Sequence, residues 1–302
     1  MRIAAAVLAL LAAGPVFAED LPLLGLAHVG IRVTDLAKAR AFYSGVIGLD
    51  EAFTTNNDDG SVFVAYFKVN DHQFIEIFPG LKPDQIVPMT HIAMYTDNLQ
   101  HLREMMLARG LEPTAIHKGP RDHNLSFSLR NPPGQELTFL EFVQYAPDSL
   151  HVKDLGRHLS PRRLSTHLEH AGIITLDVDA AYKFYVDKLG FHERWRRYHE
   201  GLQPNAPAEK PTLIHLGLPG PSKDYIELSN FNGKPAATQA RAGMAAHCSL
   251  EVPDIKKAFQ ESIDRGETKN RQQPRFGMDQ RWQFNLFDPD GTRVELMQPK
   301  AQ

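Results

Sequence analysis

The sequence predicts an α+β fold made of four similar units, each with a strand, a helix and about three further strands, grouped as two domains. The stretch AHVGIRVTDLAKARAFYSGVIGL, which starts at Ala27, is echoed by EHAGIITLDVDAAYKFYVDKLGF, which starts at Glu169. Weaker copies start at Thr90 and Ala246, and short apolar runs of strand character follow each copy. A repeat of this length is too long for a common solenoid, so two units are expected to pair in each domain.

Each unit is expected to begin with a strand and continue as an amphipathic helix. In the two strongest copies, Asp35 and Asp177 stand where a helix would begin, and aspartate is a good N-terminal cap. Gly48 and Gly190 stand where the same helices would end, and glycine is common after the last helical turn. The signals that start and stop a helix therefore recur with the repeat.

The N-terminal segment has the character of a secretory signal peptide. Arg2 precedes an apolar run, and the small residue Ala18 ends the segment. The run is too short to span a bilayer, which argues against a membrane anchor. We therefore predict a signal peptide over residues 1–18, secretion to a bacterial periplasm, and no membrane association after cleavage.

The rest of the chain divides into two domains and a connection. We predict an N-terminal domain over residues 19–146, a linker over 147–165 and a C-terminal domain over 166–302. The linker is polar and basic and shows no clear apolar period, so we expect it to lie on the surface.

The composition and charge of the chain limit the kinds of binding partner that we expect. Of the 302 residues, 42% are hydrophobic and 23% are charged, and the formal net charge is -3, which is an ordinary globular balance. The chain has no run rich in lysine and arginine, so we expect no nucleic-acid partner. The only cysteine, Cys248, excludes an intrachain disulfide, and we expect it to be a small buried residue rather than a metal ligand.

Histidines and glutamates recur at matching places in the units. Every opening strand carries a histidine, and three of the four closing strands carry a glutamate between apolar neighbours. These residues are His28, His91, His170, His247, Glu76, Glu227 and Glu295. Imidazoles and carboxylates together suit a divalent metal ion, and a buried carboxylate is costly unless it is paired or metal-bound. The recurrence therefore predicts metal sites.

The fourth closing strand departs from the pattern. The turn NPPG of the N-terminal domain resembles DPDG before the last strand of the chain. Placing Gly134 on Gly291 sets Thr138 at the position of Glu295, and Glu141 then falls on the other face of the strand unless a bulge intervenes.

The C-terminal domain is therefore predicted to hold the main metal site. Its ligands are expected to be His170, Glu227, His247 and Glu295. A weaker second site is expected in the N-terminal domain, with ligands His28, Glu76 and His91.

With these motifs, the sequence resembles the vicinal oxygen chelate superfamily, which includes glyoxalase I, extradiol ring-cleaving dioxygenases, methylmalonyl-CoA epimerase and the fosfomycin- and bleomycin-resistance proteins. The resemblance rests on HVGIRVTDLAKARAFY, EHAGIITLD and DPDGTRVEL and covers nearly all the mature chain. It implies paired βαβββ modules, each pair forming a cupped, open β-barrel around a divalent metal. That metal would chelate neighbouring oxygens of a small-molecule substrate.

The resemblance implies different ligand sets for different reactions. A glyoxalase-like lyase or isomerase would use all four C-terminal ligands, with Glu227 or Glu295 also acting as the catalytic base. An extradiol dioxygenase would use His170, His247 and Glu295 with iron or manganese.

Those dioxygenases usually carry a histidine and a tyrosine where Gln280 and Asn285 stand here. A fourth protein ligand, Glu227, also suits lyase or isomerase chemistry better, and we favour that reaction. A catechol dioxygenase remains open, and so does a binding protein that sequesters a small molecule without catalysis. The sequence does not distinguish iron, manganese, nickel and zinc as the metal. An oligomer is possible, although four units can form two barrels within one chain.

Overall fold

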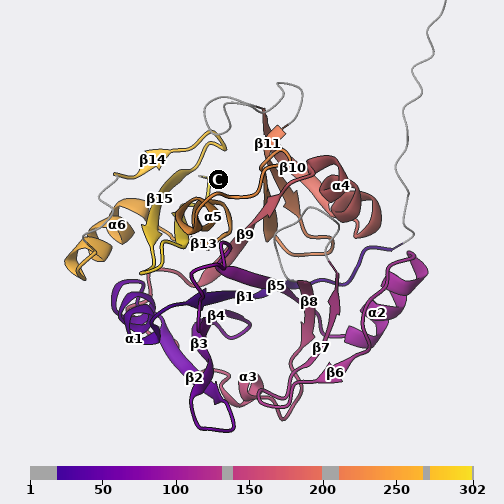
Figure 1. Cartoon of the computed structure of the whole chain (residues 1–302), viewed down its shortest axis with the longest axis horizontal. Helices are drawn as coiled ribbons and strands as arrows, with labels where there is room; N and C mark the ends of the chain where they lie inside the picture. The colour runs from indigo at the N-terminus through magenta and orange to yellow at the C-terminus, as the bar shows by residue number, and fades with distance from the viewer. Residues whose placement is uncertain (1–18, 131–138, 199–210, 268–272, 301–302) are drawn as a thin grey trace, which may run out of the picture.

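The structure of the protein is a computed structural model, which describes residues 19–130, 139–198, 211–267 and 273–300 (Figure 1). The predicted signal peptide and Thr138 lie outside the described residues. Within the described ranges, no helix combines the length and the apolar character needed to cross a bilayer.

The N-terminal half contains eight strands, and its helices follow the opening strand of each unit. The first unit comprises β1 (Gly25–Val33), α1 (Leu36–Arg40), the π-helical turn η1 (Ala41–Val46), β2 (Asp50–Asn56), β3 (Val62–Asn70) and β4 (Gln73–Pro79). The second unit comprises β5 (Met89–Tyr95), α2 (Leu99–Ala108), β6 (His117–Lys118), β7 (Leu125–Leu129) and β8 (Phe139–Gln144).

The C-terminal half repeats this order after the short helix α3 (Leu150–Lys153). The third unit comprises β9 (His167–Thr175), α4 (Val178–Tyr182), the π-helical turn η2 (Lys183–Lys188), β10 (His192–Tyr198), β11 (Pro211–Gly217) and β12 (Tyr225–Asn230). After an additional helix, α5 (Gln239–Ala245), the fourth unit comprises β13 (His247–Glu251), α6 (Ile255–Asp264), β14 (Arg275–Phe276), β15 (Trp282–Phe287) and β16 (Arg293–Met297).

Each half forms one curled eight-stranded sheet, and the two sheets have the same topology. The strand orders are β2-β3-β4-β1-β5-β8-β7-β6 and β10-β11-β12-β9-β13-β16-β15-β14. In each half the opening strands of the two units, β1 with β5 and β9 with β13, pair antiparallel at the centre of the sheet. The predicted α+β fold of four βαβββ modules in two cupped, open barrels is confirmed.

The predicted helix signals act as expected in both strong copies. Asp35 accepts a hydrogen bond from the backbone N–H of Lys38, and Asp177 accepts one from the backbone N–H of Ala180. Gly48 and Gly190 have φ angles of 84° and 77°, a backbone conformation that glycine adopts without strain.

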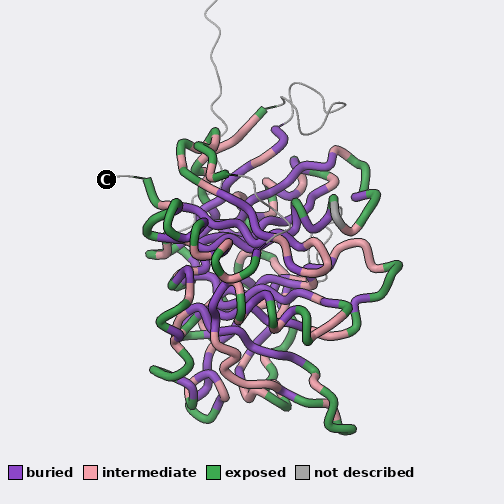
Figure 2. Tube along the Cα trace, turned by 90° about the vertical axis from the view of Figure 1, so that its left-hand side faces the viewer, coloured by how far each residue is buried: buried purple, intermediate pink, exposed green. Residues whose placement is uncertain are grey.

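One continuous hydrophobic core runs through both halves. Figure 2 shows the buried segments crossing the middle of the molecule, with exposed segments around the outside. The two halves also share polar contacts: Asp224 of the C-terminal half accepts a hydrogen bond from the backbone N–H of Leu26, at 2.8 Å. The halves therefore pack as one body through their central strands rather than as two loosely tethered domains.

The linker is more buried than the sequence predicts. His151 and Asp154 are 1% and 5% exposed, because α3 packs against the N-terminal sheet. The fully buried Lys68 donates hydrogen bonds to the backbone oxygen and the carboxylate of Asp154, at 2.6 and 2.8 Å. The expectation of a surface linker is wrong at these positions, since a polar sequence can be buried when its charges are paired.

Candidate metal centre

The four central strands of the C-terminal sheet bring the four predicted ligands together. The Nε2 atoms of His170 and His247 lie 3.1 Å apart. The Oε2 atom of Glu295 lies 3.3 Å from Nε2 of His170 and 3.5 Å from Nε2 of His247. The Oε1 atom of Glu227 lies 3.9 Å from Nε2 of His247. All four side chains are buried, so the predicted ligand set forms one cluster.

The local sequence fixes the ring of His247 in two ways. Its Nδ1 atom lies 2.9 Å from the backbone oxygen of Ala245, so Nδ1 carries the proton and the lone pair of Nε2 is available to the cluster. The ring also lies against Gly172 of the neighbouring strand, where a Cβ atom would come within 2.1 Å of Nδ1. The repeated Gly-Ile pair thus makes room for the second histidine, and Gly30 does the same for His91.

The two carboxylates of this cluster are held in the ionised form. Burial alone would raise the pKa of Glu227, but the hydrogen bond from His215 and the charges of His247 and Arg293 lower it to about 2. Burial also opposes ionisation of Glu295, yet Arg293 and the two histidine ligands hold its pKa well below the usual range. Burial lowers the pKa of His170 to about 4, so its imidazole is neutral and can act as a ligand.

Two neighbours of the cluster were not among the predicted ligands. Nε2 of His215 lies 3.0 Å from Oε2 of Glu227, and this buried hydrogen bond orients the carboxylate. The guanidinium of Arg293 lies 3.4 Å from Glu295 and 3.6 Å from Glu227. Side chains alternate along a strand, so Arg293 and Glu295, two residues apart, share a face of β16, and this signal in the sequence could have placed Arg293 at the site.

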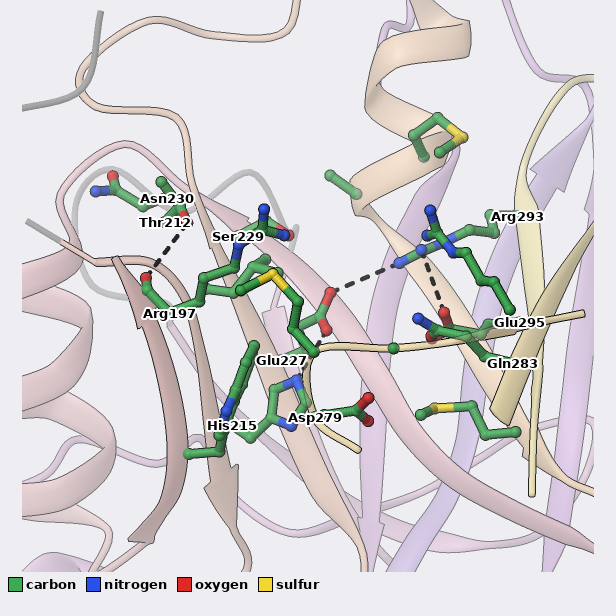
Figure 3. A pocket seen from close by; sticks show the side chains of 18 of the residues that line it. Arg197, Thr212, His215, Glu227, Ser229, Asn230, Asp279, Gln283, Arg293 and Glu295 are labelled. Carbon is green, nitrogen blue, oxygen red and sulfur yellow. Dashed lines mark hydrogen bonds and ion pairs between the residues drawn. The ribbon is translucent and has the colours of Figure 1, made fainter. Parts of the chain in front are cut away.

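The cluster lies at the wall of a cavity of about 500 Å³. Figure 3 shows Glu227 and His215 on one side of this cavity, Arg293 and Glu295 on another, and Asp279 between them. Apolar side chains complete the lining, among them Trp195. A small molecule in this cavity would therefore meet the carboxylates and the cationic side chains directly.

The N-terminal half contains a matching cluster, and it includes a fourth residue that the sequence had placed elsewhere. The predicted ligands His28, Glu76 and His91 come together, with 3.1 Å between the Nε2 atoms of the histidines. Oε2 of Glu141 lies 3.2 Å from Nε2 of His28 and 3.6 Å from Nε2 of His91. The expectation that Glu141 lies on the opposite face of its strand is therefore wrong.

The reason is the strand register. Glu141 pairs with Ala93 in the parallel ladder of β5 and β8, as Glu295 pairs with Ser249 in the ladder of β13 and β16. Counting from the turn fails because Glu141 follows Gly134 by seven residues, whereas Glu295 follows Gly291 by four. A better signal was available in Leu140-Glu141-Phe142, which repeats the apolar-Glu-apolar pattern of the other closing strands.

The N-terminal cluster has a different charge distribution. Burial raises the pKa of Glu76 to about 8, so this carboxyl group is mostly protonated at neutral pH. Burial would lower the pKa of His28, but Glu76 and Glu141 raise it to about 9. Burial would likewise raise the pKa of Glu141, but His28 lowers it to about 2. His28 and Glu141 thus form a buried ion pair when no metal is bound.

Aromatic side chains fill the cup around this second cluster. The ring of His151, from α3, lies 4.5 Å from the ring of Tyr145 and 4.7 Å from the ring of Phe74. The ring of Phe139 stacks on His91 at 4.9 Å. The linker helix therefore occupies space that remains open in the C-terminal half.

The two sites differ at equivalent positions. Tyr66 is paired with Glu76 across β3 and β4, whereas His215 is paired with Glu227 across β11 and β12. Phe139 is paired with His91. Arg293 is at the equivalent position of the other half, because Phe139 and Arg293 each lie two residues before the glutamate of their closing strand. Two apolar neighbours of the N-terminal cluster are thus replaced by a histidine and an arginine in the C-terminal cluster.

The residues of both clusters fit a divalent metal ion. In each half, two imidazoles and a carboxylate offer ligand atoms within 4.8 Å of one another. The Nδ1 atoms of His28 and His170 are buried and have no hydrogen-bond partner among the described residues. Mixed nitrogen and oxygen donors are typical of sites for zinc, iron, nickel and manganese.

Other residues singled out in the sequence have structural positions. Cys248 is fully buried and faces away from the cluster, as expected from its place next to His247. Asn285 lies opposite Glu295 in the ladder of β15 and β16. Gln280 lies in the turn between β14 and β15, with a φ angle of 63°.

Comparison with known proteins gives matches in both halves. Residues 167–296 match a family model described as the Glyoxalase/Bleomycin resistance protein/Dioxygenase superfamily, and residues 27–127 match a second model of the same superfamily. The uncharacterized protein YwkD of Bacillus subtilis (strain 168) is 33% identical over 133 residues, which cover 43% of this chain and 94% of that protein.

Solved structures resemble the whole two-domain arrangement. The 2,3-dioxygenase LapB from Pseudomonas sp. KL28 superposes with a TM-score of 0.67 at 18% identity, and the match covers 93% of each chain. Homoprotocatechuate 2,3-dioxygenase from Brevibacterium fuscum, solved in complex with 3,4-dihydroxyphenylacetate, gives a TM-score of 0.65 at 18% identity. That match covers 96% of this chain and 84% of the other. At this identity the likeness concerns the fold alone.

Proposed function

This chain belongs to the Glyoxalase/Bleomycin resistance protein/Dioxygenase superfamily, and we propose that it is a metal-dependent lyase or isomerase acting on a small oxygen-bearing substrate. The observation that carries the proposal is the C-terminal cluster of two imidazoles and two carboxylates at the wall of an open cavity. Glu227 is a second buried carboxylate that lies beside the other three residues and lines the cavity, and a base at this place favours proton transfer over the joint binding of dioxygen and a catechol.

The division of roles follows from the distances. His170, His247 and Glu295 would hold the metal, which when bound supplies a Lewis acid that polarises a carbonyl group. Glu227 lies 3.9 Å from Nε2 of His247 and Glu295 lies 3.5 Å from it, and both carboxylates line the cavity. We therefore assign the role of base to Glu227, with Glu295 as a ligand.

The proposed step is a proton shift. Glu227 removes a proton from the carbon next to the carbonyl, the electron pair of the broken C–H bond moves toward that carbonyl, and its oxygen gains the negative charge. The hydroxyl group on the first carbon then gives its proton to this oxygen and becomes the new carbonyl, and Glu227 returns its own proton to the former carbonyl carbon, so no other reactant is consumed. His215 keeps the carboxylate in place through its hydrogen bond.

The test uses matched variants of the two halves. Glu227→Gln is expected to lower turnover of a hemithioacetal substrate by about 10²- to 10⁴-fold, the usual contribution of a general base. Glu76→Gln, at the equivalent position of the N-terminal half, is expected to leave turnover within about twofold of wild type, well below the effect of losing a base. A Glu227→Gln protein that works as fast as wild type would overturn the assignment.

Ring-cleaving dioxygenation is the second candidate. The solved 2,3-dioxygenases that match nearly the full length of this chain favour it. Oxygen uptake with a panel of catechols, measured on protein loaded with iron or manganese, separates the two candidates. Uptake dependent on His170, His247 and Glu295 would support this candidate over the proton shift.

We further propose that the protein acts outside the cytoplasm, since residues 1–18 have the character of a signal peptide. N-terminal sequencing of the protein recovered from a periplasmic extract should give Glu19 as the first residue. Recovery of the intact N-terminus from the cytoplasmic fraction alone would contradict export.

A further inference from the structure

Arg293 is a buried cation whose N–H donors are not all used by acceptors of the described residues. Its side chain contacts Glu227 at 3.6 Å and Glu295 at 3.4 Å, and its Nη2 atom lies 2.6 Å from Nε2 of His247. The residue is 9% exposed, lines the cavity, and its Nε atom has no hydrogen-bond partner among the described residues. A metal would also take the lone pair of Nε2 of His247, and Arg293 would then lose that acceptor as well.

Neither the fold nor the histidine–glutamate cluster requires a cation at this position. In the N-terminal half the equivalent residue is Phe139, which stacks on His91 beside an otherwise matching set of donors. A guanidinium next to two metal-binding carboxylates repels a divalent cation and competes with it for the same oxygens. We therefore infer that Arg293 acts on a molecule in the cavity that its side chain lines.

The walls of the cavity carry an excess of positive charge. Among the described residues, the lining includes four arginines and three carboxylates, and the arginines other than Arg293 are Arg197, Arg241 and Arg275. With a divalent ion in the cluster, two further positive charges bring the net charge of this lining to +3. A cavity with this charge attracts anions and disfavours cations.

Exposed apolar side chains lie beside the arginines in the lining of the cavity. Phe276 and Met278, from β14 and the turn after it, both line the cavity and are 59% and 63% exposed. Trp195 lies on β10, at the opposite wall. Large apolar side chains exposed beside a charged cavity are typical of a binding site for an amphipathic molecule.

We propose that the C-terminal site takes an organic acid with an apolar body, and that Arg293 binds its carboxylate. An oxygen on the carbon next to the carboxylate would bind the metal held by the cluster. The apolar body of the acid would lie against Phe276 and Met278. A guanidinium suits this role because its planar set of N–H donors matches the two oxygens of a carboxylate. The inference rests on the proposed metal-bearing cavity, but it concerns binding and does not depend on which reaction follows.

The test is a binding experiment on the metal-loaded, full-length protein. Mandelate and its neutral amide, mandelamide, share the phenyl group and the hydroxyl oxygen and differ in charge. Calorimetry should give mandelate at least about tenfold tighter binding than mandelamide, which is the size expected from one charge-assisted hydrogen bond. Arg293→Gln should remove this preference, whereas Arg293→Lys should keep part of it.

Controls separate this inference from the proposed function. Metal content, measured in parallel, should stay the same or rise in Arg293→Gln, because a competing cation is removed. Lys257→Gln, which removes an exposed charge from α6 of the same half, should leave the preference unchanged.

Equal binding of both ligands to wild type, or a preference that survives Arg293→Gln, would overturn the assignment. Inorganic phosphate binding as tightly as mandelate would show general oxyanion binding and would also refute it. Failure of the proton-shift assay alone would leave the acid preference intact and would count against the reaction only.

Discussion

The imidazole of His247 occupies the space that a side chain at position 172 would need. A Cβ atom added to Gly172 would lie 2.1 Å from Nδ1 of His247 and 2.5 Å from the backbone oxygen of Ala245. Because backbone as well as side chain is crowded, the structure cannot absorb the extra carbon by a small rotation of one side chain. The position of this predicted metal ligand is thus set by a residue that has no side chain.

Gly172→Ala should therefore damage the metal site more than the fold. We expect a loss of about 1–3 kcal/mol in the free energy of unfolding, as is usual for overpacking, together with weaker metal binding. Thermal melts and metal analysis of the same sample check both effects. Gly45→Ala is the control, since a Cβ atom there would meet nothing within 4 Å. A Gly172→Ala protein with wild-type metal content would contradict the crowding argument.

Turnover, measured together with metal content, should distinguish the two clusters. We expect the full-length protein to hold one divalent ion in each half, because both clusters contain two histidines and two glutamates. His247→Ala should lose one ion and all turnover, whereas His91→Ala should lose one ion and keep most turnover. Elemental analysis and an activity assay on the same preparations make this comparison. Loss of turnover in His91→Ala without unfolding would contradict the assignment of catalysis to the C-terminal half.

The buried ion pair between Lys68 and Asp154 should be important for stability. Lys68→Met leaves the buried carboxylate of Asp154 with His158 as its remaining side-chain partner in an ion pair, and removal of one member of a buried pair typically costs about 3–5 kcal/mol. Lys118→Met, which breaks a pair with Asp148 on the surface, should cost at most about 1 kcal/mol. Urea denaturation of the two variants gives the difference, and equal losses would show that burial of the pair is unimportant.

The pair of His167 and Asp224 should make stability depend on pH. Burial would lower the pKa of His167, but the ion pair with Asp224, with 2.8 Å between Nε2 and Oδ1, raises it above 6.5. The pKa of His167 is higher in the folded protein than in the unfolded chain. The pair therefore stabilises the protein fully below pH 6.5 and loses this effect as the pH rises through the pKa of the folded state. The stability difference between wild type and His167→Gln should therefore shrink between pH 6 and pH 9, as measured by denaturation at each pH. A difference that grows with pH would have the wrong sign.

The repeat made most of this fold predictable. Strand, aspartate cap, helix and glycine recur in the sequence, and each copy folds with the same topology because the same local signals are present. The clustering of His170, Glu227, His247 and Glu295 followed from the places of these residues in the repeat. Glu141 was misplaced because strand register depends on pairing with β5 rather than on distance from the preceding turn.

The contacts of Arg293 and the burial of α3 were harder to foresee. They depend on which segments distant in the sequence meet in space, and a single sequence carries no direct record of that. His151, for example, lies in a polar and basic segment, and its burial follows from aromatic side chains contributed by four different parts of the N-terminal half.

The burial of α3 has a consequence for the history of the molecule. This helix lies between the two repeated halves and belongs to neither, yet it fills the cup of the first half. Once a duplicated chain carries a second working pocket, the first is released from selection for access and can be sealed by whatever segment lies near. Shortening this connection by design would then be a way to open the N-terminal pocket and obtain a protein with two accessible pockets.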